Sequence, residues 1–292
     1  PGPFNDDGPG ETVSRQKIFI SKPASEADEM ACAEKILSNL ARRAYRRPVQ
    51  PDDMPQLLDL YKLGAEEGGF EGGIRLGLQK ILVSPDFLFR AELDPPNAEP
   101  GSVYKISDIE LASRLSFFLW SSIPDEELLS IAEKGELHEP AVMQAQVKRM
   151  MADSRSSSLI HNFVGQWLFL RNISRLAPDT FTYPSFDENL RRAMGKETEL
   201  LVESQVREDK PVADMLSTDY TFLNERLAEH YGIKGVYGNE FRRVKLEDPR
   251  RHGLLGQASI LPLTSYPNRT APTIRGKRVL AHLLRVPPPP PP

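Results

Sequence analysis

The sequence predicts a mainly α protein, in which helical bundle-like domains follow an extended N-terminal arm and little of the chain forms strands. Three observations support this. Apolar residues recur at spacings of three and four, the pattern of a buried helix face. The 26 prolines fall between these periodic segments, where they end helices. Only FRRVKL, at residues 241–246, is a convincing internal strand candidate.

Composition limits the classes of protein to which the chain can belong. With 292 residues and 39% hydrophobic content, it is long enough for one large or two ordinary globular domains. No run approaches the ~18 apolar residues of a membrane-spanning helix. A net charge of -4 gives no general attraction to nucleic acid. We therefore expect no transmembrane segment and no nucleic-acid partner, and no signal peptide opens this sequence.

The cysteine and histidine content argues against a metal site. Cys32 is the only cysteine, which excludes an internal disulfide and a cysteine-based zinc site. The five histidines are scattered and show no ligand spacing such as H-x-x-x-H. We expect this stretch of chain to bind neither a metal nor a cofactor by itself.

The first predicted elements are an arm and a helical domain. Residues 1–24 are rich in Pro and Gly and predict an extended arm, with at most one strand at the apolar patch Ile18–Ile20. A first helical domain covers residues 25–93, and the Pro-rich residues 94–102 predict a linker. Within that domain, apolar spacing predicts helices from Ser25 to Pro48, around 54–61 and around 74–82.

A second helical domain is predicted for residues 103–246. Ser107 and Glu110 have the pattern of a capping box, so a helix begins there. Asn224 is a natural N-cap and Gly232 a natural C′ residue for a short helix near the end. Between them, periodicity predicts helices at residues 124–133, 140–151, 154–168 and 187–207.

The last part of the sequence predicts a domain that begins but is truncated. Residues 247–286 predict the start of a third domain, and residues 287–292 are consecutive prolines. Because Pro lacks an N–H and fixes φ, this run forms a stiff polyproline II spacer. A spacer separates two modules, so we expect the natural protein to continue into another one.

Two charged clusters have both a functional and a structural interpretation. The arginines could bind phosphate, but a solvated helix end whose cations complement the helix dipole explains them better; they are Arg42, Arg43, Arg46 and Arg47. The acidic residues could hold a metal or act as an acid–base pair, but this helix lacks the Glu-x-x-His of bundle metal sites; they are Glu197, Glu199 and Glu203. For the acidic cluster we expect an exposed helix face.

A candidate functional surface lies in two later segments. His230 lies in the last turn of the short helix of residues 224–231, where a cation matches the helix dipole, so its structural interpretation is the stronger one. Small hydroxyls, an amide and arginines then gather in a loop before a helix, which is typical of an anion site and also of a well-satisfied turn. The candidate residues are His230, His252, Ser265, Asn268, Arg269, Thr270 and Arg275.

Three blocks of sequence resemble the large multidomain proteins of planctomycetes, in which domains of unknown function accompany a planctomycete-type cytochrome c domain. The first block is LARRAYRRPV with FEGGIRLGLQKILVSPDFLFR. The second runs from LASRLSFFLWSSIPDEELL through NFVGQWLFLRN to DYTFLNERLAEHYG. The third is RHGLLGQASILPLTSYPNRTAPTIRGKRVL with the Pro run. The resemblance covers nearly the whole chain.

The resemblance implies properties that the residues alone do not. Relatives continue after the Pro-rich segment into a C-x-x-C-H motif, so haem c is implied for a missing downstream segment and the downstream haem module is the expected partner. A periplasmic or cell-envelope location and a role in electron transfer follow. Relatives usually carry cysteines near Phe19 and near position 32, and this chain has Ser21 in the first place. Cys32 has then lost a disulfide partner and is a small buried residue.

Three hypotheses for function remain open. The leading one is a helical accessory or scaffold region of a cell-envelope cytochrome-c-type protein, whose Arg269 and Arg275 bind an acidic ligand such as a haem propionate or a glycan. The second is part of an oxidoreductase or polymer-degrading enzyme, which a deep pocket with a desolvated carboxylate or His would favour. The third is a non-redox interaction module, which predicts a large exposed apolar patch.

Overall fold

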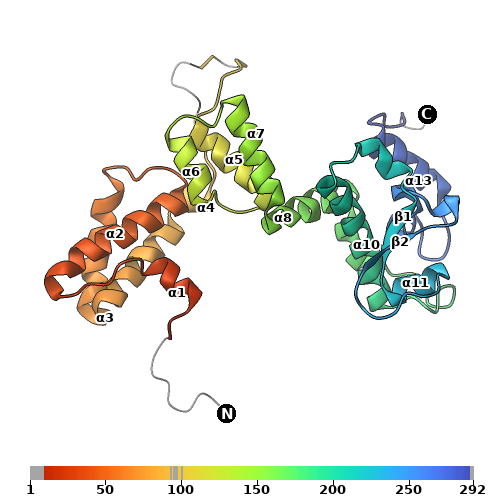
Figure 1. The fold of residues 1–292 in the computed structure, drawn as a ribbon, viewed down its shortest axis with the longest axis horizontal. Helices are drawn as coiled ribbons and strands as arrows, with labels where there is room; N and C mark the ends of the chain where they lie inside the picture. The colour runs from red at the N-terminus through yellow and green to blue at the C-terminus, as the bar shows by residue number, and fades with distance from the viewer. Residues whose placement is uncertain (1–9, 93, 95–97, 100, 290–292) are drawn as a thin grey trace, which may run out of the picture. The chain divides into compact units, whose positions relative to one another are not determined.

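The structure is a computed structural model that describes residues 10–92, 94, 98–99 and 101–289. Helices dominate these residues and one two-stranded sheet accompanies them, which confirms the mainly α class. The chain divides into two compact units, residues 1–149 and 150–292 (Figure 1). Parts of the predicted arm, linker and proline spacer lie outside the described residues. The predicted domain limits stay a prediction.

In the first unit, α2 packs along α3 and α5 packs on α6 (Figure 1). Its core contains Ile36, Leu37, Leu57, Ile74 and Ile81, all nearly inaccessible to solvent. The helices are α1 (Val13–Ile18), α2 (Glu26–Tyr45), α3 (Asp53–Val83), α4 (Pro85–Leu88), α5 (Asp108–Trp120), α6 (Glu126–Glu133) and α7 (Pro140–Ala152), the last of which runs into the second unit.

Helix α3 joins two segments that the sequence predicts as separate helices. Gly68 and Gly69 leave helical geometry, and Gly69 has a φ of +60°, so the break lies where only glycine adopts the backbone without strain. The capping box of Ser107 and Glu110 at the start of α5 is confirmed. The helix boundary before Pro85 is also confirmed, since α3 ends at Val83.

The N-terminal arm differs from the prediction where the structure describes it. Residues 13–18 form α1, capped by Thr12, so the strand expected at Ile18–Ile20 is wrong. Ser21 Oγ lies 3.2 Å from Cys32 Sγ, and Cys32 is half-buried. The position that the resemblance assigned to a lost disulfide partner is therefore adjacent to Cys32.

The basic cluster at the end of α2 is not a solvated helix end. Arg46 is only 6% exposed, and its guanidinium donates to backbone carbonyls that include those of Phe87 and Phe89. Arg42 pairs with Glu126 and Glu133 of α6, and Arg47 with Asp53 and Asp86. These guanidiniums therefore link α2 to neighbouring segments. Carboxylates and carbonyls already accept from the N–H donors that a phosphate would need, so the cluster is not a phosphate site.

The second unit is less regular and has α10 at its centre. Helix α10 contacts strand β1 and helix α11, and the core around it contains Leu190, Met194, Leu223 and Leu227 (Figure 1). Its elements are η1 (Ser154–Ser156), α8 (Ser157–Leu159), η2 (Ile160–Val164), α9 (Gly165–Trp167), η3 (Leu170–Arg175), α10 (Glu188–Arg207), η4 (Val212–Leu216), β1 (Tyr220–Leu223), α11 (Glu225–Tyr231), β2 (Arg242–Lys245), η5 (Pro249–Arg251), η6 (Leu254–Gly256), α12 (Ile260–Leu263), α13 (Pro272–Arg278) and η7 (Val279–Leu283).

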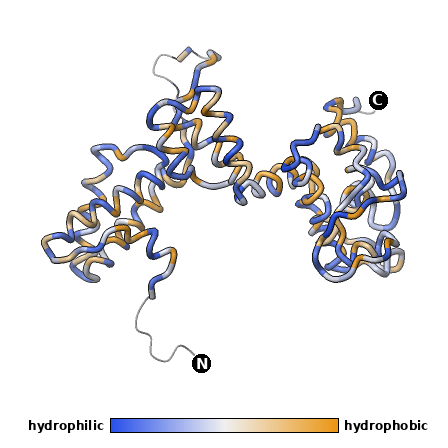
Figure 2. The backbone as a smooth tube through the Cα atoms, in the orientation of Figure 1, coloured by the Kyte–Doolittle hydropathy of each residue, from blue (hydrophilic) through white to orange (hydrophobic). Residues whose placement is uncertain are grey.

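The strand predicted at residues 241–246 is confirmed as β2. Its antiparallel partner β1, with Tyr220 opposite Lys245, was not expected. The caps of α11 are confirmed: Asn224 accepts from the Leu227 N–H, and Gly232 ends the helix at a φ of 70°. No helix among the described residues is long and apolar enough to cross a membrane, and Figure 2 shows hydrophilic and hydrophobic residues alternating along much of the chain.

Candidate functional site

A cavity of about 510 Å³ in the second unit collects residues from several segments, and we call it the basic pocket. Four of the residues predicted from sequence line it, namely His230, Ser265, Thr270 and Arg275. Because they come from α11, from the loop after α12 and from α13, only the fold brings them together.

The other three predicted residues lie outside the lining of the basic pocket. His252 is half-buried and its Nε2 donates to the Leu246 carbonyl at 3.1 Å, which gives it a structural role. Asn268 and Arg269 are exposed in a tight turn, which a hydrogen bond from Tyr266 N to the Arg269 carbonyl closes at 2.9 Å. The Arg269 guanidinium lies 5.0 Å from the centre of the Tyr266 ring.

Three guanidiniums give the basic pocket its name. Arg275 is joined by Arg251, the last residue of η5, and by Arg175, the last residue of η3. Arg251 contacts the Tyr231 ring and the Gly256 carbonyl, and Arg275 donates to the Thr264 hydroxyl at 3.3 Å. None of the three has a carboxylate partner among the residues that the structure describes, and no acidic side chain lines the pocket.

Glycines in the RHGLLGQ segment hold Arg251 in place. Gly253 has a φ of +69°, and its N–H donates to the Thr218 carbonyl at 2.8 Å. A Cβ at this position would lie 2.1 Å from the Leu216 carbonyl oxygen, so no other residue fits. A Cβ at Gly256 would likewise lie 2.5 Å from the Arg251 carbonyl oxygen. The tight turn therefore fixes the backbone next to Arg251, which lines the pocket.

Apolar and aromatic side chains form the rest of the basic pocket. Leu190 and Met194 lie one turn apart on α10 and are buried, and Phe186 precedes them. Tyr183 and Tyr266 line the pocket with 41% and 48% of their surface exposed. The pocket thus combines cationic groups with an apolar wall, the usual composition of a small-molecule site.

His230 is the one imidazole of the basic pocket. Burial lowers its pKa from 6.5, and the charges of Arg251 and Arg226 lower it further. The lowered pKa favours the neutral ring, which can accept a hydrogen bond or a proton. The expected pairing of a His230 cation with the helix dipole is opposed by these two arginines.

A buried carboxylate lies directly behind the basic pocket. Glu197, on α10, is 0% exposed, and burial raises its pKa to about 7. Thr221 Oγ1 donates to its Oε1 at 2.6 Å, and Tyr231 Oη donates to its Oε2 at 2.8 Å. Tyr231 Oη in turn accepts from the N–H of Ala258, a residue of the pocket wall, at 2.8 Å.

The prediction of an exposed acidic face on α10 is therefore wrong for Glu197. Helical spacing contained the signal, because residue 197 falls between the buried Met194 and Leu201 on one face of the helix. Arg251 and Arg175 were missed as pocket residues. Nothing in the local sequence distinguishes Arg175 from other surface arginines.

Glu199 and Glu203 line a separate polar groove of about 350 Å³. His161 Nδ1, on η2, lies 3.1 Å from Glu199 Oε1, and Glu203 pairs with Arg207 at 2.8 Å. Across the described residues, no group of three His, Cys, Asp or Glu side chains is arranged to hold a metal. The fold thus places His161 beside the acidic residues of α10, a helix that has no histidine of its own, but the described residues include no third ligand that would complete a metal site.

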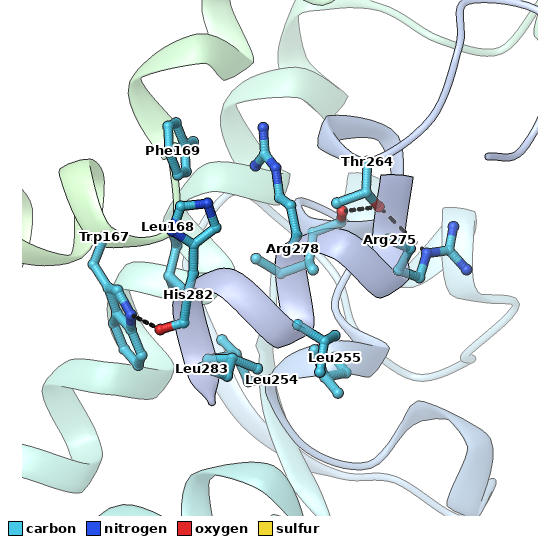
Figure 3. Close-up of a pocket in the computed structure, with 12 residues that line it drawn as sticks. Trp167, Leu168, Phe169, Leu254, Leu255, Thr264, Arg275, Arg278, His282 and Leu283 are labelled. Atoms are coloured by element: carbon cyan, nitrogen blue, oxygen red, sulfur yellow. Dashed lines mark hydrogen bonds between the residues drawn. The ribbon is translucent and has the colours of Figure 1, made fainter. Parts of the chain in front are cut away.

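A third cavity, of about 40 Å³, has room for only a few water molecules (Figure 3). Arg278 and His282 lie against the ring of Phe169, and Trp167 Nε1 donates to the His282 carbonyl at 3.2 Å. Figure 3 shows the Arg275 guanidinium directed away from this group. The small cavity is a gap in apolar packing.

Three protein-family models match the chain and together cover most of it. They are PSD5, a protein of unknown function (DUF1595), at residues 32–92; PSD4, a protein of unknown function (DUF1592), at residues 106–233; and PSCyt3, a protein of unknown function (DUF1588), at residues 251–292. The chain belongs to the planctomycete-type cytochrome c proteins. No curated protein and no solved structure matches it.

The residues of this planctomycete-type cytochrome c chain do not fit covalent attachment of haem c. Attachment needs two thiols and a histidine in C-x-x-C-H, whereas Cys32 is the only cysteine and is half-buried in the first unit. The PSCyt3 match contains Arg251 and Arg275, and the PSD4 match contains Arg175, His230 and Glu197. Two family domains therefore contribute to the basic pocket.

Proposed function

We propose that this chain is the helical ligand-binding region of a planctomycete-type cytochrome c protein, and that its basic pocket holds a small organic anion. The observation that carries the proposal is the convergence of Arg175, Arg251 and Arg275 on a cavity without acidic lining. Guanidiniums without carboxylate partners, beside an apolar wall, favour a ligand with one negatively charged group and an apolar body. A pure scaffold needs no such pocket.

The family supports a wider proposal for the whole protein. We infer that this region accompanies a haem c module further along the natural chain and that the assembled protein works in electron transfer at the cell envelope. The basic pocket would then supply recognition, while the haem module supplies redox chemistry. A reduced-minus-oxidised spectrum of the full-length protein tests the haem module, and fractionation of the native cells tests the location.

One observation favours an enzyme as the second candidate. His230 lines the basic pocket and its pKa is lowered, so it could accept a proton from a substrate that the arginines hold. Turnover would then require His230, whereas binding alone would not. Replacement of His230 by Gln separates the two, since Gln preserves size and polarity without serving as a base.

The test of anion binding is calorimetric titration of the purified chain with organic carboxylates. Arg251→Ala should weaken binding at least tenfold, because a hydrogen bond to a charged group contributes about 1.5–3 kcal/mol. Arg250→Ala is the matched control: the neighbouring arginine is paired with Asp248 and its side chain is 89% exposed. Arg175→Ala, at an exposed position, gives a second variant with little effect on folding. Equal affinities in the wild type, Arg251→Ala and Arg175→Ala would contradict the proposal.

A further inference from the structure

The walls of the basic pocket discriminate between classes of organic anion. A sugar acid carries several hydroxyls, and each one needs a polar partner once water is excluded. The lining contains no Asp, Glu, Asn or Gln side chain. The Ser265 hydroxyl is already used, since it donates to the Leu261 carbonyl at 2.8 Å. Apart from the arginines, the polar side chains left for an acidic glycan are His230 and the hydroxyls of Tyr183, Ser185, Tyr266 and Thr270, and the rest of the lining is apolar. The pocket therefore offers a sugar ring less polar contact than apolar contact.

The same walls suit a flat apolar body. Phe186, Tyr183 and Tyr266 offer ring surfaces, and Met194 and Leu190 offer a polarisable and an aliphatic contact on α10. Aromatic rings pack favourably against other rings and against methionine sulfur. A cavity of about 510 Å³ accommodates a ligand of one or two fused rings with a charged group.

Two of the three guanidiniums are held in place before any ligand arrives. Arg251 stacks on Tyr231, with its guanidinium carbon 4.7 Å from the ring centre, and Arg275 is hydrogen-bonded to Thr264. A fixed guanidinium loses less side-chain entropy on binding and offers the paired donors that match a carboxylate. Arg175 is exposed and has no such support, so its contribution should be smaller.

We propose that the basic pocket binds an aryl carboxylate, with the carboxylate on Arg251 and Arg275 and the ring against Phe186, Leu190 and Met194. This inference rests on the proposed function and narrows its ligand class. It predicts that both the charge and the ring are required, because the guanidiniums and the apolar wall each supply part of the binding free energy.

The experiment titrates the chain with 2-naphthoate, the neutral 2-naphthalenemethanol and glucuronate. We expect saturable binding of 2-naphthoate, at least tenfold weaker binding of the neutral compound, and no binding of glucuronate. Arg275→Lys keeps the positive charge but loses the paired N–H donors of the guanidinium, so it should weaken the binding of 2-naphthoate severalfold. Arg250→Ala should leave its affinity unchanged, and melting curves show whether each variant is folded.

A variant that fills the basic pocket tests the site of binding without changing any arginine. Ala177 lines the basic pocket at an exposed position, so Ala177→Trp fills the cavity from the rim and should abolish 2-naphthoate binding. Binding that survives both Ala177→Trp and Arg251→Ala would overturn the inference. Glucuronate binding without 2-naphthoate binding would overturn the aryl class and leave the organic-anion function intact. Failure of every carboxylate to bind would overturn both.

Discussion

Replacement of Glu197 by Gln should change how the stability of the second unit depends on pH. Glu197 is buried among Thr221, Tyr231 and the Ala258 N–H, and its pKa lies well above that of an exposed glutamate. A raised folded-state pKa means that the protonated form is the one the fold accommodates. Its contribution to stability is therefore complete below the unfolded pKa and is lost as the pH rises to the folded pKa.

The magnitude follows from the two pKa values. The pKa of Glu197 rises from 4.5 to about 7, and one pH unit corresponds to about 1.4 kcal/mol. Through this group, the wild type should therefore lose about 3 kcal/mol of stability between pH ~4.5 and pH ~7. Above pH ~7 the contribution of Glu197 to stability should no longer change with pH. Gln resembles the protonated carboxyl: its carbonyl can accept from Thr221 and Tyr231, and its amide can donate to Tyr231 Oη. Glu197→Gln should remove the slope.

The assay is urea unfolding from about pH 5 to about pH 8, followed by tryptophan fluorescence. Trp167 reports on the second unit and Trp120 on the first, so a Trp120→Phe background isolates the relevant transition. Glu203→Gln is the matched control, because Glu203 lies on the same helix and pairs with Arg207 at the surface. An unchanged slope in Glu197→Gln, or an equal change in the control, would refute this reasoning.

The remaining predictions concern covalent geometry and packing. Ser21→Cys should form a disulfide with Cys32 under oxidising conditions, because the Ser21 Oγ and Cys32 Sγ lie 3.2 Å apart, and stabilise the first unit by about 3 kcal/mol; two titratable thiols would contradict this. Gly253→Ala should cost about 3 kcal/mol or more in urea unfolding, since its Cβ would overlap the Leu216 carbonyl oxygen. Arg46→Met should destabilise the first unit by a similar amount, because it leaves buried carbonyls without donors. A urea unfolding midpoint equal to that of the wild type would show that these hydrogen bonds do not stabilise the unit.

Local rules predicted the helices well and the site only partly. The caps at Ser107 and Asn224 were readable because a cap depends on residues a few positions apart. Strand β1 was missed because a four-residue strand has little periodicity, and its partner lies some twenty residues further along the chain. Whether an arginine lines a cavity or donates to buried carbonyls depends on the tertiary fold, and so Arg46 and Arg251 could not be distinguished in sequence.

The buried carboxylate and the basic pocket share parts, so ligand binding and proton binding should be linked. The positive charge of Arg251 lowers the pKa of Glu197, and Ala258 belongs both to the pocket wall and to the Glu197 hydrogen-bond network. A carboxylate on Arg251 would offset that charge and raise the pKa of Glu197, so by reciprocity 2-naphthoate should bind more tightly as the pH falls.

His230 lines the same cavity, and its protonation would also favour an anion, so the two contributions must be separated. Its pKa lies below 6.5, whereas that of Glu197 is about 7. Glu197→Gln should therefore remove the upper part of the pH dependence of the 2-naphthoate affinity, and His230→Gln the lower part. An affinity that rises equally toward acid pH in the wild type and in Glu197→Gln would show that the carboxylate is only structural, and that His230 alone couples the pocket to pH.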